Sequence, residues 1–115
     1  MNDIKELQEK IQKFAADRDW DQFHSAKNIA MALNVEAAEL LECFQWLTED
    51  QSNNLSPSSL AAASEEVADI FVYLLTMANT LNIDLIAATK AKIAKNAIKY
   101  PIEKSKGNAL KYDKL

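Results

Sequence analysis

The chain carries two short acidic stretches, Glu36-Ala37-Ala38-Glu39 and Glu66-Val67-Ala68-Asp69. Each places two carboxylates three residues apart within an apolar, helix-forming segment, so both side chains of a pair lean to one side of a helix. If the two helices pack together, four carboxylates meet in one place. Two negative charges about 4 Å apart repel by roughly 4 kcal/mol at an effective dielectric constant of about 20. The pairs therefore predict raised pKa values or a bound cation, and Mg²⁺ is the simplest choice for oxygen ligands.

The composition indicates one all-α domain that spans residues 1–115. The chain has 115 residues, of which 49% are hydrophobic, enough for one core and too few for two domains. One glycine and two prolines leave every hydrophobic segment uninterrupted, and Ala, Leu, Glu and Lys favour helices. We therefore predict a four-helix bundle whose two central helices carry the acidic pairs and pack antiparallel.

Helical periodicity and capping residues set the expected elements. Ser25 and Ser56 are suitable N-caps, and Pro57 suits the first position of a helix. The aromatic-rich stretch 18–24 interrupts the periodicity and is expected to be a loop that plugs the core or forms a ligand wall. The expected helices are 3–17, 25 to about 48, 57 to about 81 and 85–99, with a polar loop at 49–56 and an extended or flexible tail from about residue 102.

Apolar faces flank both acidic stripes on helical wheels. On the helix that starts at Pro57, the adjoining face is expected to be buried and consists of Val67, Ile70, Phe71, Leu74, Ala78 and Leu81. The helix that starts after Ser25 is apolar nearly all round, with Met31 and Ala38 extending its apolar surface. A helix of this kind in so short a chain predicts a subunit interface as well as a core.

Net charge and cysteine content restrict the class of protein. The net charge of −4 and the pI of about 5.0 argue against binding to a nucleic-acid polymer. The N-terminus has no apolar signal-peptide core, and no apolar run approaches the roughly 20 residues that span a bilayer. A single cysteine, Cys43, fits a reducing compartment. A cytoplasmic protein without a membrane partner is expected.

The acidic pairs could instead be solvated positions that form salt bridges along each helix, but no lysine or arginine follows Lys27 within the two central helices. A di-iron bundle expects Glu-x-x-His motifs, whereas the only histidine, His24, lies outside both pairs. His24 and Cys43 also cannot supply a zinc site, and an all-oxygen site selects Mg²⁺ or Mn²⁺. A non-catalytic helical module that binds a nucleotide or a protein stays open as an alternative.

A carboxylate-bound Mg²⁺ usually keeps several waters and binds substrate phosphates. Lys92, Lys95 and Lys99 could hold the rest of a polyphosphate, although a solvated helix face explains them as well. The aromatic side chains that could stack on a base, or equally pack in the core, are Trp20, Phe23, Trp46 and Tyr73.

In order and spacing, these residues resemble the MazG-like all-α nucleoside triphosphate pyrophosphohydrolases, with the dCTP pyrophosphatase branch as the nearer match. The likeness runs from residue 4 to about residue 113. The stretches that carry it are residues 14–24, Lys27-Asn28, Phe44-Gln45-Trp46, the two acidic pairs with Tyr73, Lys92 to Asn96, and Lys99-Tyr100-Pro101. Ile11 departs from the histidine that animal members of this branch tend to carry near the base.

The resemblance implies an enzyme that hydrolyses a nucleoside triphosphate to the monophosphate and pyrophosphate. It implies that water attacks the α-phosphorus and that Mg²⁺ is required, with Mn²⁺ able to replace it. The expected substrate is dCTP or a 5-modified dCTP, and the expected role is removal of surplus or modified triphosphates from the nucleotide pool. A homo-oligomer, a tetramer in preference to a dimer, with sites built from more than one subunit is also implied.

The same resemblance assigns roles to individual residues. It implies that Glu36, Glu39, Glu66 and Asp69 hold the metal and are catalytic. The residues that it implies for substrate binding are Trp20, Asp21, Gln22, Phe23, His24, Asn28, Trp46, Tyr73, Lys92, Asn96 and Tyr100.

Overall fold

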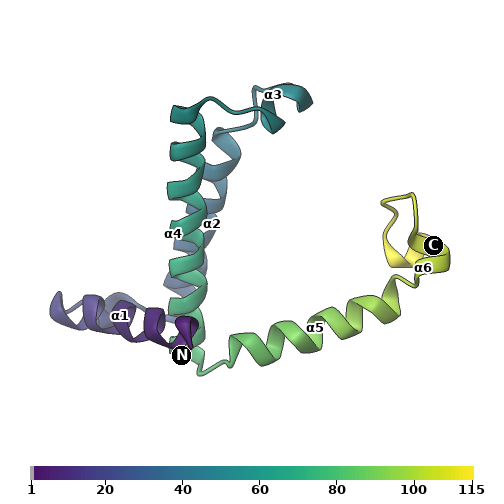
Figure 1. Cartoon of the computed structure of the whole chain (residues 1–115). Coiled ribbons are helices and arrows are strands. Elements are labelled where there is room, and N and C mark those ends of the chain that lie inside the picture. Colours follow the sequence, from purple (N-terminus) through teal and green to yellow (C-terminus); the bar gives the residue numbers. More distant parts are fainter. Residues whose placement is uncertain (1) are drawn as a thin grey trace. The chain divides into compact units, whose positions relative to one another are not determined.

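The computed structural model describes residues 2–115, which form helices and turns with no strand among them (Figure 1). The all-α prediction is therefore confirmed. The long helices are α1 (Asp3–Asp17), α2 (Ala26–Glu42), α4 (Pro57–Leu81) and α5 (Leu85–Lys99). The short elements are the helices α3 (Glu49–Asn53) and α6 (Ile102–Ser105) and the single 3-10 turns η1 (Asp21–Phe23) and η2 (Tyr112–Lys114).

The chain divides into two compact units, one ending at Ile83 and the other running from Asp84 to Leu115. Within the first unit, α4 packs against α2 and also against α1. Figure 1 shows α2 and α4 side by side and running in opposite directions, as predicted for the two central helices. This pairing brings residues about thirty positions apart in the sequence onto facing helices.

Local capping explains why the long helices begin where they do. The Ser25 hydroxyl accepts a hydrogen bond from the Asn28 amide at 3.1 Å, and the Ser56 hydroxyl accepts one from the Ser59 amide at 3.2 Å. Pro57 occupies the first position of α4, where its missing N–H costs nothing. Asn82 ends α4 in the left-handed conformation, with φ of 54°. The predicted starts of these helices are confirmed.

The end of α2 and the segment after it differ from the prediction. α2 ends at Glu42 instead of about Thr48, and the expected polar loop contains the helix α3. Thr48 and Gln51 form a capping box: the Thr48 hydroxyl accepts from the Gln51 amide at 3.2 Å, and the Gln51 side chain accepts from the Thr48 amide at 2.9 Å. This reciprocal cap starts a new helix at a residue that was expected to lie in the old one.

The tail was expected to be extended or flexible from about residue 102, yet it contains α6 and η2. Within the second unit, the rings of Tyr100 and Tyr112 meet edge to face with centroids 6.3 Å apart. The Lys99 ammonium lies 4.8 Å from the centre of the Tyr112 ring. The tail is therefore folded back on the end of α5 by aromatic and cation–π contacts.

The buried core of the described residues is small. Its apolar members are Ala15, Ile29, Ala63, Leu75 and Ala78, accompanied by Thr76. Two hydrogen bonds join α1 to α4. The Gln8 side-chain amide donates to the Asn79 side-chain oxygen at 2.9 Å, and the Asn79 side-chain amide donates to the Gln8 backbone carbonyl oxygen at 3.4 Å. Contrary to prediction, much of the α4 face was not buried: the side chains of Val67, Phe71, Leu74 and Leu81 are exposed.

The helices differ in length and hydropathy, the two properties that decide whether a helix can span a bilayer. Taken singly, no helix within residues 2–115 is both long enough and apolar enough to cross a membrane. Among the described residues, α4 and α5 taken as one pair are long enough and apolar enough to pass the same test.

Leu75→Ala is expected to lower the free energy of unfolding by about 3 kcal/mol, because Leu75 is almost fully buried and its truncation leaves a cavity. The measurement is urea denaturation followed by far-UV circular dichroism. Leu60→Ala is the matched control, since the Leu60 side chain is 56% exposed, and its loss is expected to be less than half as large. Equal losses in the two variants would contradict the assignment of the core.

Candidate active site

A cluster of carboxylates forms where α2 faces α4. Glu36 and Glu39 lie almost one turn apart on α2, and Glu66 comes from the facing side of α4. One oxygen of each of the three carboxylates lies within 4.8 Å of the others. Asp69, the fourth predicted acid, is outside this group, although its charge still acts on Glu36. The antiparallel pairing of α2 and α4 is what brings the three acids together.

The electrostatics of the cluster reflect this crowding. The pKa of Glu36 is raised from 4.5 to about 7, chiefly because its protonated form shares a hydrogen bond with Glu66, and further because of burial and the neighbouring Glu39 and Asp69. One oxygen of Glu36 and one of Glu66 are buried without a hydrogen-bond partner within residues 2–115. Buried acceptors of this kind are costly unless something satisfies them.

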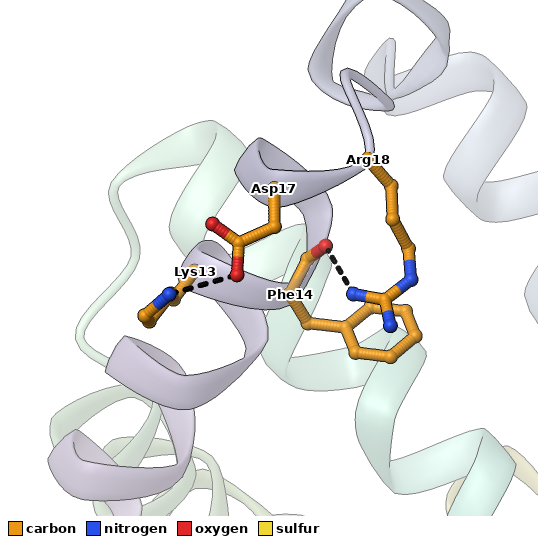
Figure 2. Close-up of polar contacts among 4 residues, drawn as sticks. All are labelled: Lys13, Phe14, Asp17 and Arg18. Atoms are coloured by element: carbon orange, nitrogen blue, oxygen red, sulfur yellow. Dashed lines mark hydrogen bonds and ion pairs between the residues drawn. The ribbon is translucent and has the colours of Figure 1, made fainter.

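Within residues 2–115, no ion pair reaches the carboxylates of Glu36, Glu39 and Glu66. The ion pairs found in the described part of the chain are Lys10 with Glu6 at 3.8 Å and Lys13 with Asp17 at 2.8 Å, both within α1 (Figure 2 shows the second). Once all three carboxylates are ionised, they only accept hydrogen bonds, so their crowded oxygens cannot satisfy one another. An all-oxygen donor set with unsatisfied buried atoms fits a hard divalent cation.

The stretch after α1 is braced by aromatic and cation–π contacts. Figure 2 shows the Arg18 guanidinium over the Phe14 ring, 3.6 Å from its centre, while an Arg18 N–H donates to the Phe14 carbonyl oxygen at 3.1 Å. Phe14 meets Trp20 edge to face at 5.7 Å, and Trp20 meets His24 at 6.4 Å. These contacts hold residues 18–24, the segment that was predicted to be a loop, against the end of α1.

Hydrogen bonds hold the same loop from its other side. The Asn28 side chain on α2 donates to the Phe23 carbonyl oxygen at 3.0 Å. The Gln22 side-chain amide donates to the carboxylate and the carbonyl oxygen of Asp19, a residue with φ of 55°. Four predicted substrate-binding residues, Trp20, Gln22, Phe23 and Asn28, thus take part in the contacts that shape this loop.

A polar cavity of about 410 Å³ lies between α1, the loop and the C-terminal part of α4. Polar groups converge on it from all three, namely Gln12, Asp21, His24, Thr76, Asn79 and Thr80. Sequence reasoning anticipated Asp21 and His24 as binding residues and missed the others as a set. Thr76 lies seven residues after Asp69 and so on the same side of α4. Only the packing of α1 on α4 brings Gln12 beside it.

An apolar groove of about 560 Å³ runs between α1 and α4 on the other side of Ile11, which lines both hollows. Its apolar walls include Leu7, Phe14, Phe71 and Val72. The charged groups that line it are Lys10 and Asp69, so one of the predicted metal ligands opens onto it. The sequence did not predict that Lys10 and Asp69 line the same groove, because the two residues are far apart along the chain.

The remaining predicted site residues are Trp46, Tyr73, Lys92, Asn96 and Tyr100. Trp46 follows α2 and is 87% exposed. Tyr73 is half-buried on α4, one turn beyond Asp69. Lys92, Asn96 and Tyr100 belong to the second unit, so their part in the site stays a prediction.

Comparisons with known proteins place this arrangement in a family. Residues 31–115 match the family model described as MazG-like. The chain belongs to the MazG-like family. Curated relatives named dCTP pyrophosphatase 1 align with the whole chain over 117 residues: the bovine protein is 39% identical and the human protein 37% identical. The alignments cover 68% and 67% of those two proteins.

A solved structure resembles this MazG-like chain as well. A pyrophosphatase from Archaeoglobus fulgidus superposes with a TM-score of 0.83 and 35% sequence identity. The match covers 88% of this chain and 94% of the archaeal one. The predicted MazG-like all-α fold is therefore confirmed.

The pKa of Glu36 predicts how the stability of the metal-free protein depends on pH. The folded state keeps a proton on Glu36 up to about pH 7, whereas the unfolded state loses it near pH 4.5. The free energy of unfolding should therefore fall as pH rises from about 4.5 to 7 and level off above that. Urea denaturation in a chelator at a series of pH values measures it.

Glu36→Gln should remove this contribution, so the difference between wild type and variant carries the signal. Glu65→Gln is the matched control, because Glu65 is exposed and outside the cluster. If the free energy of unfolding of the wild type and of Glu36→Gln changed in parallel from pH 4.5 to 7, the raised pKa of Glu36 would be contradicted.

Proposed function

We propose that this MazG-like protein is a Mg²⁺-dependent hydrolase that converts dCTP, or a 5-modified dCTP, to the monophosphate and pyrophosphate. Its class, a nucleoside triphosphate diphosphatase, follows from its family and from relatives named dCTP pyrophosphatase 1. The observation that carries the proposal is the carboxylate cluster of α2 and α4, which forms no ion pair within the described residues and has two buried oxygens without a partner there. The corresponding role is removal of surplus or modified triphosphates from the cytoplasmic nucleotide pool.

Glu36, Glu39 and Glu66 would hold the metal, with Asp69 as a further ligand. Bound there, Mg²⁺ (or Mn²⁺ in its place) would neutralise phosphate charge and acidify a bound water. The buried oxygens of Glu36 and Glu66 that lack partners can each accept a hydrogen bond, because ionised carboxylates are acceptors only. One of these glutamates would orient the attacking water and receive its proton.

In the proposed reaction, the water oxygen forms a bond to the α-phosphorus. The bond from the α-phosphorus to the bridging oxygen breaks, and pyrophosphate leaves with the electron pair. Carboxylates that fix the water and the phosphate relative to one another lower the entropic part of the barrier. The residues proposed to bind the nucleotide around this centre are Trp20, Asp21, Gln22, Phe23, His24, Asn28, Trp46, Tyr73, Lys92, Asn96 and Tyr100.

The proposal includes assembly into a tetramer or a dimer, with residues 1–115 as one domain. On α2, Met31 and Val35 are 52% and 54% exposed, and Ala38 continues their stripe on the side of the helix away from Glu36. Trp46 beyond the end of α2 is more exposed still. Apolar surface on this scale supports an interface between copies of the chain.

The product of the reaction tests the enzymatic assignment. Incubation with dCTP and Mg²⁺ should release pyrophosphate and dCMP, measured by a pyrophosphate-specific coupled assay beside an orthophosphate assay. Glu66→Gln should lower turnover by about a hundredfold or more, because it removes a charge from the metal site while the helical content stays unchanged. Glu65→Gln, one residue away and exposed, should retain activity.

Two results would argue against this function. Release of orthophosphate alone would place attack at a different phosphorus. Absence of turnover, together with no thermal stabilisation by Mg²⁺ and a triphosphate analogue, would favour the non-catalytic module.

Light scattering coupled to size exclusion tests the assembly. The mass should be four or two times the 12.9 kDa of one chain. Met31→Glu should lower it, because a charge would be buried in the interface. Lys5→Glu on α1 is the control for a change of charge on an exposed helix, and it should leave the mass unchanged. A monomeric wild type would show that the exposed stripe of α2 is no interface.

A further inference from the structure

We propose that Asp19 is a positioning residue for nucleotide binding: it adopts a left-handed backbone conformation after α1 and uses its carboxylate to orient Gln22. This inference rests on the proposed function and deepens it, because it concerns how the loop is set before a nucleotide arrives. Asp19 does not belong to the residues proposed to touch the substrate. It acts through Gln22, which does.

The backbone of Asp19 has φ of 55°, in the left-handed region that an L side chain rarely occupies. Glycine is the usual residue at this position after a helix, because it has no Cβ to meet the neighbouring carbonyl oxygen. Aspartate tolerates the conformation better than most residues do, but less well than glycine. The backbone alone would therefore favour glycine here, so the explanation for an aspartate lies in its side chain.

The left-handed residue closes the end of α1. The Trp20 amide donates to the Ala15 carbonyl oxygen at 2.9 Å, and the Asp19 amide donates to the Ala16 carbonyl oxygen at 3.1 Å. This pair of bonds is the Schellman motif, in which the chain reverses its direction directly after a helix. Beyond the turn, the Trp20 ring meets the Phe14 ring edge to face with centroids 5.7 Å apart. The turn at Asp19 therefore directs the start of the loop back onto α1.

The Asp19 side chain fixes the orientation of Gln22. The Gln22 side-chain nitrogen donates to the Asp19 carbonyl oxygen at 3.0 Å and to the Asp19 carboxylate at 3.1 Å. Both partners are acceptors, so a flipped amide would place its oxygen against two other oxygens. The Gln22 nitrogen must therefore face Asp19, and the Gln22 oxygen is the atom that can accept a hydrogen bond from a ligand. Glycine at position 19 would keep the bond to the carbonyl oxygen and lose the bond to the carboxylate.

Asn82 provides a comparison within the same chain. It ends α4 with φ of 54°, and the Ile83 amide donates to the Ala78 carbonyl oxygen at 2.9 Å, so the backbone arrangement matches that at Asp19. Asn82 lies in the connection between α4 and α5 and does not line the polar cavity beside the loop. The two residues thus share a left-handed helix end, but only Asp19 belongs to the loop proposed for substrate binding.

Helix termination alone is the rival explanation for Asp19. If it were sufficient, glycine at position 19 would satisfy the same turn and leave nucleotide binding unchanged. With a positioning role the two effects separate, because the turn is kept or improved while Gln22 loses an anchor. A less favourable backbone retained for function is expected to show this opposition between stability and binding.

The test measures the melting temperature, and KM and kcat for dCTP with Mg²⁺, in the full-length protein. Asp19→Gly should keep or raise the melting temperature, yet raise KM about 2- to 10-fold, the net worth of one hydrogen bond, with kcat changed less than about twofold. Asp19→Asn tolerates the same turn and keeps a side-chain oxygen for Gln22, so its KM should stay within about twofold of the wild-type value. Asn82→Gly is the matched control and should leave KM and kcat unchanged.

Two further measurements do not depend on turnover. Calorimetry with a non-hydrolysable α,β-imido analogue of dCTP gives Kd, which should rise in Asp19→Gly by the same factor as KM. Trp20 fluorescence is isolated with Trp46→Phe, because the chain has two tryptophans. Acrylamide should quench Trp20 more strongly once Asp19→Gly is added, because the loop is then less firmly held.

Weaker analogue binding and stronger quenching in Asp19→Gly, without turnover in any protein, would support the positioning role while refuting the proposed hydrolysis. Unchanged KM and Kd in an active enzyme, or an equal rise in Asn82→Gly, would overturn the positioning role and leave the hydrolysis intact. A lower melting temperature together with weaker binding would also overturn it, because loss of the turn would then explain both. The same holds for wild-type protein that does not bind the analogue.

Discussion

The close approach of Glu36, Glu39 and Glu66 raises the free energy of the metal-free fold, and the packing of α2 on α4 must offset that cost. Glu36 responds by holding a proton to about pH 7, and two buried oxygens in the cluster lack partners within residues 2–115. A divalent cation relieves both problems at once. The carboxylate cluster that destabilises the metal-free protein is thus also the group of side chains that suits a divalent cation. The proposed reaction uses the same carboxylates.

The loop between α1 and α2 depends on a different kind of interaction. Arg18 covers one face of Phe14, Phe14 supports Trp20, and Trp20 contacts His24. These contacts are weak singly, about 1 kcal/mol each, but they act in series on one short segment. Their effect is to keep Asp21 and His24 at the wall of the polar cavity. The loop can then present a polar group to a ligand without relying on the ligand to order it.

A third feature is the amount of apolar side chain left uncovered in the first unit. The buried core of the described residues is made largely of alanine, while the larger Met31, Val35 and Trp46 are exposed. A chain of 115 residues has little interior, so association is a common way for such a chain to gain buried area. Met31 and Ala38 lie on the side of α2 away from Glu36, whereas Val35, four residues before Glu39, borders the carboxylates.

The helical class, the N-caps at Ser25 and Ser56, and the segments that carry the acids could all be predicted from the amino-acid sequence. These depend on residues within one or two turns of each other, so periodicity and capping chemistry suffice to predict them. The same reasoning failed at Thr48, because a capping box can start a helix wherever the chain leaves the previous one. By contrast, it is the packing of the helices in space that brings three of the four acids together and joins Gln12 to Thr76 at one cavity. Such juxtapositions are set by the packing of helices whose residues are far apart in sequence, and no local pattern records them.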